Sequence, residues 1–326
     1  MVTMKAITFR EYGSASVLEV SDIQKPELND GEVLIKVAGA GINRPDILQR
    51  SGFYPPPKEA SEILGLEVSG TVVETGANLD NDLIGQEVCA LLTGGGYAEY
   101  TKCHISTVLP VPKGISLLDA CTIPETFFTV WTNLFDQAKL NDEDTLLVHG
   151  GASGIGLTAL SIASQFGVKC YTTVGNDQKK EFIERQGLAT CINYNKEDFE
   201  ERLKNSNVSI DVILDIVGGE YFQKNINLLN KFGRLINIAY LNGSIVTANL
   251  LPIMLKRLVV SGSTLRIRSN EEKKLIKNSL LKNIWPLIES NSIKLYIDRK
   301  YDYFDIKNAH EYMESNKNIG KLLLKF

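Results

Sequence analysis

A cluster of glycines between a predicted strand and a predicted helix constrains the fold of this chain more than any other feature. Residues 146–160 read LLVHGGASGIGLTAL, with four glycines among residues 150–156. An apolar run precedes the cluster, and apolar residues at helical spacing follow it. Glycines at such a junction either turn the backbone sharply into the helix or let another group approach closer than a side chain would permit.

The glycine cluster lies within a long alternation of strands and helices that begins near residue 125. Apolar strands are predicted at 144–150, 168–175, 189–195, 210–218, 234–243 and 259–266. Helices are predicted between them at 155–167, 177–187, 196–205 and 220–233. Strand–helix pairs with nearly continuous apolar strands predict an α/β fold, a parallel sheet covered by helices on both faces.

Residues 4–110 have a different texture, with short alternating or β-branched runs broken by Gly and Asn, which is typical of a mostly β unit. The loop FYPPPKEAS interrupts this unit and places Tyr54 at the mouth of a stiff, exposed segment. Residues 304–326 read as a helix followed by a strand that returns to the first unit. A length of 326 residues also favours two domains.

Charge and composition limit the possible partners. Lys and Arg total 35 against 39 Asp and Glu, a formal net charge of −4, so we expect neither nucleic acid nor an anionic membrane surface as a partner. No apolar run reaches the ~20 residues of a membrane span, and the first residues lack the features of a targeting peptide, so a cytoplasmic location is expected. The five cysteines and three histidines are scattered, which predicts buried thiols and no metal site.

The segment HGGASGIG places a dinucleotide fingerprint where a strand meets a helix. The pattern G-x-G-x-x-G maps onto Gly151, Ser153 and Gly156, with serine in the middle place. Gly151 is expected to permit the tight turn, and Gly156 to let the helix lie close to the strand. The helix N-terminus would present N–H groups and partial positive charge to a diphosphate. A glycine-rich turn without a ligand is the alternative.

The end of the second strand indicates which dinucleotide is bound. Sites specific for NAD place an acid there, about 20 residues past the glycines. This chain has Val, Gly and Asn at 174–176, and Lys179 and Lys180 begin the next helix. An amide and nearby ammonium groups suit a 2′-phosphate, which predicts NADPH. Asp177 is expected to cap the helix, and a merely solvated helix face remains the alternative for the lysines.

Over essentially its full length the chain resembles the medium-chain dehydrogenase/reductase superfamily. Within that superfamily it resembles the zinc-independent quinone oxidoreductases, and most closely the p53-inducible branch. The resemblance implies a GroES-like, mostly β catalytic domain (1–124 and 265–326) and a Rossmann domain with a doubly wound parallel sheet that binds NADPH (125–264). The segments that carry it are GINRPDILQRSGFYPPP, ILGLEVSGTV, LLTGGGYAEY, IPETFFTVW, VHGGASGIG, ILDIVGG, GSTLR and EYMESNKNIGKLLL.

Departures from the zinc-dependent members concern the metal. Zinc alcohol dehydrogenases of this superfamily have a Cys where this chain has Asn43 and a His–Glu pair where it has Leu66 and Glu67. A catalytic zinc needs three protein ligands, so Glu67 alone is not expected to hold one. The four-cysteine structural lobe is missing as well.

The resemblance also implies roles for individual residues. Asn43 and Tyr54 would be catalytic and lie beside the nicotinamide and the substrate carbonyl. The other implied cofactor contacts are Thr129, Gly151, Ala152, Ser153, Gly154, Ile155, Gly156, Asn176, Lys179, Tyr194, Ile238, Ala239, Tyr240, Leu265, Arg266 and Lys321, the last closing over the cofactor.

Several of these residues have plainer alternatives. Asn43 could satisfy loop backbone, and Tyr54 could pack on the prolines. Thr129 could bond to its own helix backbone. Arg266 could form a surface ion pair, and Lys321 could be solvated.

The implied reaction is zinc-independent hydride transfer from NADPH to a quinone, with Tyr54 and Asn43 as donors to the acceptor oxygen. Reduction of enals, enones or enoyl thioesters is one alternative, and a non-catalytic, crystallin-like NADPH-binding protein is another. RNA binding has no support in the charge or residue pattern. The run LVVSGSTLR (258–266) could pair with its copy in a second subunit, so a homodimer is expected.

Overall fold

The computed structural model describes residues 3–326. The chain divides into two compact units, residues 1–128 with 266–326, and residues 129–265. We call the first the β-rich unit and the second the parallel-sheet unit. Each has its own buried apolar core.

The parallel-sheet unit contains six strands in the order β10-β9-β8-β11-β12-β13, and every neighbouring pair is parallel. The chain therefore starts in the middle of the sheet, builds outward to β10, returns to pair β11 with β8, and continues to the other edge. The strands are β8 (Thr145–His149), β9 (Lys169–Val174), β10 (Thr190–Asn193), β11 (Ile210–Asp215), β12 (Leu229–Asn237) and β13 (Val259–Gly262).

This strand order is that of a Rossmann fold, and it fixes where a ligand can bind. The direction of winding reverses between β8 and β11, and open parallel sheets bind ligands at the carboxyl ends of the strands beside such a reversal. The glycine cluster directly follows β8. The helical segments of this unit are η5 (Trp131–Gln137), α3 (Gly154–Gln165), α4 (Asp177–Arg185), α5 (Phe199–Asn205), α6 (Tyr221–Leu228) and α7 (Leu251–Lys256).

One predicted helix is too long. The expected helix over 220–233 ends at Leu228, and β12 begins at the next residue. Leu229 pairs with Ile210 of β11, so sheet pairing overrides the helical spacing of the apolar residues. Phe232 has a φ of +66°, which no helix accommodates.

The β-rich unit holds a two-stranded sheet and a seven-stranded sheet. The larger has the order β14-β15-β3-β4-β5-β7, with β6 paired to β3. Only β14 and β15 are parallel. The strands are β1 (Thr3–Thr8), β2 (Glu19–Gln24), β3 (Glu32–Ile42), β4 (Glu67–Thr75), β5 (Glu87–Leu91), β6 (Tyr100–His104), β7 (Val108–Pro110), β14 (Ile297–Asp302) and β15 (Lys321–Lys325).

The helices of the β-rich unit are mostly short. The α-helices are α1 (Arg44–Arg50), α2 (Pro124–Val130), whose last two residues belong to the other unit, α8 (Asn270–Asn283), α9 (Trp285–Glu289) and α10 (Ile306–Glu314). Single turns are η1 (Ala15–Val17), η2 (Asn81–Leu83), η3 (Ile105–Thr107), η4 (Asp119–Thr122) and η6 (Tyr303–Asp305).

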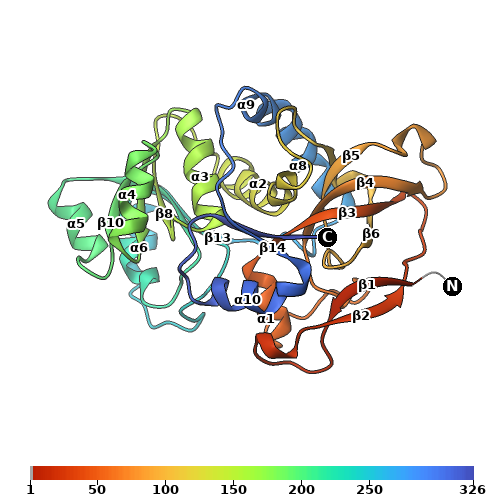
Figure 1. Cartoon of the computed structure of the whole chain (residues 1–326). Helices are drawn as coiled ribbons and strands as arrows, with labels where there is room; N and C mark the ends of the chain where they lie inside the picture. The colour runs from red at the N-terminus through yellow and green to blue at the C-terminus, as the bar shows by residue number, and fades with distance from the viewer. Residues whose placement is uncertain (1–2) are drawn as a thin grey trace. The chain divides into compact units, whose positions relative to one another are not determined.

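The last strand completes the β-rich sheet. β15 runs antiparallel to β3, with Leu322 opposite Ile42, and the C-terminus of the chain lies beside β3 in Figure 1. The predicted return of the tail to the first unit is therefore confirmed. Because Ile42 ends β3 and Lys321 begins β15, this pairing places Lys321 beside the start of α1.

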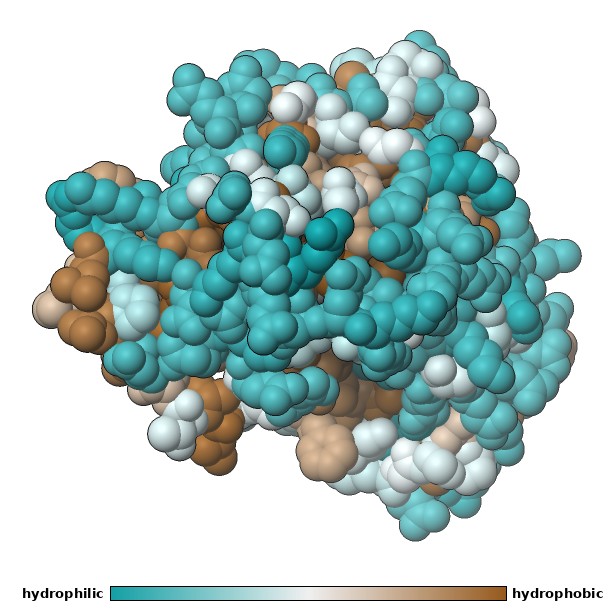
Figure 2. Space-filling view, turned by 90° about the vertical axis from the view of Figure 1, so that its left-hand side faces the viewer, coloured by the Kyte–Doolittle hydropathy of each residue, from teal (hydrophilic) through white to brown (hydrophobic). Residues whose placement is uncertain are grey.

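Two further properties concern the surface and the thiols. Within residues 3–326, no helix combines the length and apolarity that crossing a membrane requires. Figure 2 shows one mostly hydrophilic face with apolar patches at its left-hand edge and along its lower part. All five cysteines are buried and unpaired, as predicted, and burial raises the pKa of each thiol, to about 12 for Cys103, Cys170 and Cys191.

Candidate functional site

Two of the glycines after β8 are required by close packing, and a third by the turn. The left-handed residue of the turn is Gly150, with φ +74°, whereas we expected Gly151 to play this part. At Gly151 a Cβ would lie 2.0 Å from the Thr172 hydroxyl, so glycine is needed there for space. At Gly156 a Cβ would lie 2.4 Å from the Gly150 carbonyl oxygen, which explains how α3 packs against the end of β8.

The first turn of α3 offers donors to an anion. Ser153 is the N-cap, and its Oγ accepts a hydrogen bond from the Gly156 N–H at 3.0 Å, which leaves the hydroxyl hydrogen available to a ligand. The N–H groups of Gly154 and Ile155 have no partner within the helix, and the helix N-terminus carries partial positive charge. Ala152, which belongs to the same turn, is buried. These groups fit a diphosphate.

A buried polar chain fixes the strands beneath the loop. His149 Nε2 lies 2.7 Å from Asn225 Oδ1, and His149 Nδ1 lies 3.0 Å from the Thr173 hydroxyl. Because an amide oxygen only accepts, Nε2 carries the proton and Nδ1 accepts from Thr173. Burial lowers the pKa of His149, which keeps the ring neutral. Asn225 then donates to Asp215 Oδ2 at 3.1 Å, so the chain joins β8, β9 and β11.

The next two strands end in turns held by backbone hydrogen bonds. Asp215 accepts from the N–H groups of Val217 and Gly218, and its carbonyl accepts from the N–H of Ile238 at 2.9 Å. Ile238 and Ala239 are half-buried, and Tyr240 is exposed. A Cβ at Gly218 would lie 2.6 Å from the Tyr240 ring. The predicted segment 238–240 therefore lies beside the turn that follows β11.

The end of β9 contains no acid, and the nearby Asp177 is already paired. Asn176, not Asp177 as expected, caps α4, because its Oδ1 accepts from the Lys179 N–H at 2.9 Å. Asp177 is bonded to Lys196 and Asn193, and the hydrogen bond from Lys196 holds its pKa below the ordinary value. Tyr194 is exposed, and its hydroxyl would lie 2.6 Å from a Cβ at Gly175.

Two predicted contacts lie at the ends of the parallel-sheet unit. Thr129 is buried, and its carbonyl accepts from Asn133 Nδ2 at 2.8 Å within the same helical stretch. Leu265 is the last residue of this unit and is also buried.

Lys321, Asn43 and Glu67 meet around a buried ion pair in the β-rich unit. Lys321 Nζ lies 2.6 Å from Glu67 Oε1, 2.6 Å from Asn43 Oδ1 and 3.1 Å from the Ile42 carbonyl. Asn43 Nδ2 donates to the same Glu67 oxygen at 2.9 Å. All three side chains are buried. Two features bring these side chains together. Asn43 is the N-cap of α1, directly after the end of β3, and the pairing of β15 with β3 places Lys321 beside it.

The polar atoms of Asn43 and Lys321 thus form hydrogen bonds within the β-rich unit. The Asn43 amide donates to Glu67 and to the Gly41 carbonyl, and its oxygen accepts from Lys321. Lys321 is neither solvated nor extended from the surface, which excludes the plain alternative considered for it. Contacts of either residue with a cofactor or a substrate stay predictions.

Arg266 and Tyr54 form a second feature of the β-rich unit. The Arg266 guanidinium carbon lies 5.4 Å from the centre of the Tyr54 ring. Arg266 is only 5% exposed, so the surface ion pair considered for it is wrong. Its Nε donates to the Thr93 carbonyl and its Nη2 to Gln49 Oε1, whereas Nη1 has no hydrogen-bond partner. Burial and the charge of Glu125 raise the pKa of Tyr54.

Sequence reasoning missed two carboxyl groups in this unit. Asp46 accepts from the N–H groups of Asn43 and Gly65 and from the Tyr97 hydroxyl, and burial nevertheless raises its pKa to about 6. Glu125 donates its backbone N–H to Glu67 Oε2 at 2.8 Å, and burial together with the Glu67 charge raises its pKa to about 8. The signal for Glu125 was that it is the only charged residue in the stretch 120–131.

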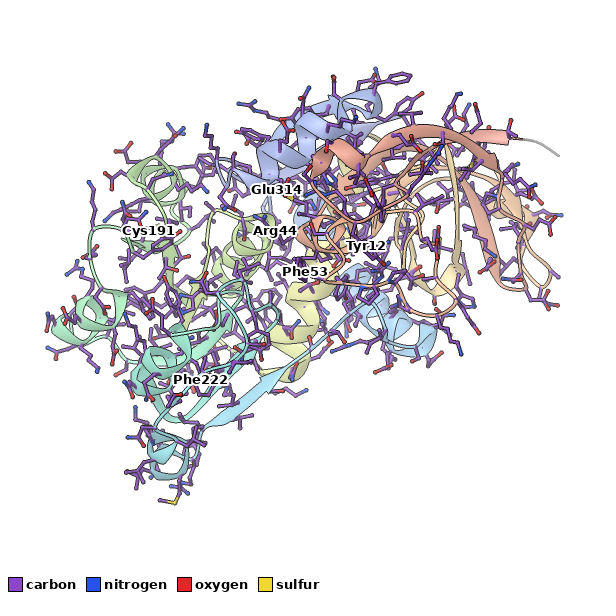
Figure 3. All side chains as sticks on the ribbon, turned by 90° about the horizontal axis from the view of Figure 1, so that it is seen from below. Tyr12, Arg44, Phe53, Cys191, Phe222 and Glu314 are labelled. Carbon is purple, nitrogen blue, oxygen red and sulfur yellow. The ribbon has the colours of Figure 1, made fainter. Side chains whose placement is uncertain are left out.

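Aromatic and charged side chains lie around the two ends of α1. Figure 3 shows Phe53 and Tyr12 near one another, and Phe53 is 80% exposed. In the same view Arg44 and Glu314 lie close together. Glu314 accepts from the buried Arg50 at 2.6 Å. Among residues 3–326, no three His, Cys, Asp or Glu side chains are placed to share one metal ion.

Two family models match parts of the chain. A model described as a zinc-binding dehydrogenase matches residues 186–324, and one described as an alcohol dehydrogenase GroES-like domain matches residues 29–113. Quinone oxidoreductase 1 of Escherichia coli is 29% identical over 98% of each chain. A highly-reducing polyketide synthase of Aureobasidium melanogenum is 29% identical over 94% of this chain, which spans only 14% of the length of that relative.

Solved structures agree on the fold. The quinone oxidoreductase from Coxiella burnetii is 27% identical with a TM-score of 0.83 and covers 100% of both chains. A mycobacterial protein complexed with NADPH is 26% identical with a TM-score of 0.87, covering 99% of this chain and 100% of that one. JamJ enoyl reductase has a TM-score of 0.89 at 22% identity over 99% of each chain, a likeness of fold alone. The chain is thus similar to zinc-binding dehydrogenases over residues 186–324 and to the GroES-like domain of alcohol dehydrogenases over residues 29–113, and quinone oxidoreductases resemble it over nearly its whole length at about 28% identity.

Proposed function

We propose that this protein is a zinc-independent NADPH:quinone oxidoreductase, related most closely to the p53-inducible branch. The observation that carries the proposal is the glycine-rich turn and helix N-terminus at the reversal point of the parallel sheet, together with the missing acid at the end of β9. The similarity to quinone oxidoreductases over nearly the whole chain supports the acceptor class.

The parallel-sheet unit supplies the groups that would bind NADPH. Residues 151–156 would hold the diphosphate, and Asn176, Lys179 and Tyr194 would surround the 2′-phosphate. Asp177 does not replace the missing acid, because Lys196 and Asn193 already bind its carboxylate. Thr129, residues 238–240 and Leu265 would contact the ribose and nicotinamide. When bound, NADPH supplies a hydride.

The β-rich unit supplies the groups that would act on the acceptor. The Tyr54 hydroxyl would donate to the acceptor oxygen, where negative charge develops. Arg266 would orient the Tyr54 ring, because its guanidinium lies over the ring face. Asn43 contributes by holding Glu67 and Lys321 in place.

The proposal that the reaction needs no zinc rests on the surroundings of Glu67. Its Oε1 accepts from Lys321 and Asn43, and its Oε2 accepts from the Glu125 N–H. An ammonium group 2.6 Å from the carboxylate provides the positive charge that a metal ion would otherwise bring. A second cation at this place would be repelled by Lys321.

The proposed function is tested by cofactor binding and acceptor turnover. Purified protein would be titrated with NADPH and NADH, and turnover would be measured with 9,10-phenanthrenequinone and a naphthoquinone. We expect tighter binding of NADPH and oxidation of NADPH by both quinones in the presence of a chelator. Binding of neither nucleotide would refute the proposal, and tight NADPH binding without turnover would favour a non-catalytic protein.

A second candidate is the reduction of the conjugated double bond of enals, enones or enoyl thioesters. The relatives named as polyketide synthases, at 25–29% identity, favour this candidate. Relative kcat/KM values for an enone, an enoyl-CoA and the two quinones separate the candidates. A preference of about tenfold or more for the conjugated acyl compounds would replace the quinone assignment.

A homodimer is proposed on the exposed edge of the parallel sheet. Among the described strands, β13 pairs with β12 alone, and Val259 and Val260 are exposed. An unpaired apolar edge is a site for pairing with another strand, and a second copy of the chain offers an identical edge.

A further inference from the structure

Glu125 is a carboxyl group for which the proposed hydride transfer has no use. We propose that Glu125 is the acid that protonates the acceptor after the hydride arrives, and that it matters far more for enones and enoyl thioesters than for quinones. This inference rests on the proposed function and assigns a residue to its proton.

The backbone at Glu125 is held by a hydrogen bond, whereas its side-chain carboxyl stays partly accessible. Its backbone N–H donates to the buried Glu67 Oε2 at 2.8 Å, which anchors the first turn of α2 to β4. Within residues 3–326, no side chain donates a hydrogen bond to the Glu125 carboxyl or pairs with it. The side chain is only partly exposed. A carboxyl group held in this way can exchange a proton with a small molecule or water.

The charges around Glu125 come from four other elements. Glu67 of β4 and Asp46 of α1 oppose its ionisation, and Lys321 of β15 and Lys273 of α8 favour it. Both ammonium groups have other partners, since Lys321 binds Glu67 and Lys273 donates to the Arg266 carbonyl at 2.9 Å. Desolvation by burial is the largest influence, and the pKa of Glu125 is raised to about 8. The carboxyl is therefore largely protonated at neutral pH.

Tyr54 and Arg266, whose side chains could both donate a hydrogen bond to an oxygen atom, are close enough to Glu125 to be influenced by its charge. The Glu125 charge acts on both Tyr54 and Arg266. Arg266 Nη1 is buried and has no hydrogen-bond partner, although a buried guanidinium N–H ordinarily has one. An acceptor oxygen placed at Nη1 and the Tyr54 hydroxyl would satisfy that donor, and Glu125 would then supply a proton to the reduced acceptor.

The proton balance explains the expected selectivity. Hydride addition to the β carbon of an enone breaks the C=C π bond, forms a C–H bond and leaves a strongly basic enolate. Glu125 gives its proton to that enolate, and the resulting carboxylate recovers a proton from water. Hydride addition to a quinone leaves a hydroquinone monoanion, which is weakly basic and takes its proton from water without a positioned acid.

The first measurement follows the carboxyl group in the cofactor-free protein. Infrared difference spectra of the protonated-carboxyl band would be recorded between pH 6 and 10 for the wild type, Glu125→Gln and the surface control Glu87→Gln. A band that titrates near pH 8 in the wild type and the control, and that is absent in Glu125→Gln, supports the proposal. A wild-type band identical to that of Glu125→Gln overturns it.

The second measurement compares acceptors. For Glu125→Gln we expect kcat/KM to fall about 10²-fold with an enone or enoyl-CoA and less than tenfold with 9,10-phenanthrenequinone. Glu125→Asp, which retains an acid, should recover part of the loss. The wild-type enone rate should fall as the pH rises through about 8, and this step should vanish in Glu125→Gln. Equal losses with both acceptor classes, or no loss with either, overturn the proposal.

The outcomes separate this inference from the proposed function. Quinone turnover with an unchanged enone rate in Glu125→Gln leaves the proposed function intact and removes the role of Glu125. A wild type that binds no NADPH or reduces neither acceptor class refutes both. Thermal unfolding of each variant shows whether a loss of rate reflects a loss of folded protein.

Discussion

At the scale of single residues, the ion pair between Lys321 and Glu67 contributes strongly to the free energy of unfolding. Replacing Lys321 by Met should destabilise the protein by about 3–5 kcal/mol, because Glu67 would remain buried without its countercharge. Urea unfolding of the variant provides the measurement. The double variant Lys321→Met/Glu67→Gln should recover most of the loss. Equal losses in the single and double variants would mean that packing, and not charge, is responsible.

Tyr54 provides a second residue-scale prediction. Tyr54→Phe removes the hydroxyl and keeps the ring under Arg266. We expect kcat with a quinone to fall by less than about 10²-fold, because a lost donor of this kind costs ~10²–10³ for more demanding carbonyl chemistry. The NADPH dissociation constant should stay within about twofold. Steady-state kinetics and a cofactor titration decide the matter, and an unchanged kcat would contradict the role given to Tyr54.

The sequence alone predicts residues whose task is local and misses those whose task depends on distant neighbours. Ser153 could be placed at the start of a helix, because capping depends on residues three positions away. The state of Glu125 depends on Glu67, which is 58 positions earlier, and on Lys321, almost 200 positions later. No local pattern contains that information.

At the scale of secondary-structure elements, the contact between α3 and β8 links stability to cofactor binding. Gly156→Ala places a Cβ 2.4 Å from the Gly150 carbonyl oxygen and should push α3 away from the turn. We expect a loss of about 1–3 kcal/mol in stability and an NADPH dissociation constant at least tenfold higher. Chemical unfolding and a fluorescence titration measure the two effects.

A matched glycine serves as the control for Gly156→Ala. Gly187, in the same unit, has a φ of +70° and open space around its Cβ position. Gly187→Ala should lower stability by about 1 kcal/mol through backbone strain alone and leave NADPH affinity unchanged. Similar losses of affinity in both variants would show that general destabilisation explains the result at Gly156.

Element type was easier to predict than element length. The alternation of strands and helices and the parallel sheet followed from the pattern of apolar residues, and the turn followed from the glycine cluster, whereas the doubly wound order was implied by the family resemblance. The boundary between α6 and β12 did not, because it is set by the pairing of Leu229 with Ile210. Helix α8 was not predicted, although Ser269 and Glu272 form a capping box at its start.

At the scale of the whole molecule, Glu125 makes stability depend on pH. Its pKa is near 4.5 in the unfolded chain and about 8 in the folded protein, so the folded state holds the proton more tightly. The contribution of the protonated Glu125 carboxyl to stability is complete below pH 4.5. It decreases as the pH rises from 4.5 and is lost once the pH has passed through 8. Glu125→Gln should therefore gain stability relative to the wild type over this range, by on the order of 1–3 kcal/mol at pH 9. Urea unfolding at several pH values tests this prediction, and a constant difference would contradict it.

The exposed edge of the parallel sheet predicts the assembly. Sedimentation should give a species of about 72 kDa, twice the 36.1 kDa of one chain. Val260→Lys in β13 should produce a monomer, whereas Ile245→Lys, which changes an exposed apolar residue outside that strand, should not. A wild type that sediments only as a monomer would remove the proposed homodimer.

The burial of the five cysteines has a consequence for a protein that handles quinones or enones. Such compounds are soft electrophiles that arylate or alkylate ionised sulfur. Only the thiolate attacks them at an appreciable rate, and burial raises the pKa of every thiol in this chain. The folded protein is thereby protected from covalent inactivation by the molecules it is proposed to consume, and this protection lasts only while the thiols stay enclosed.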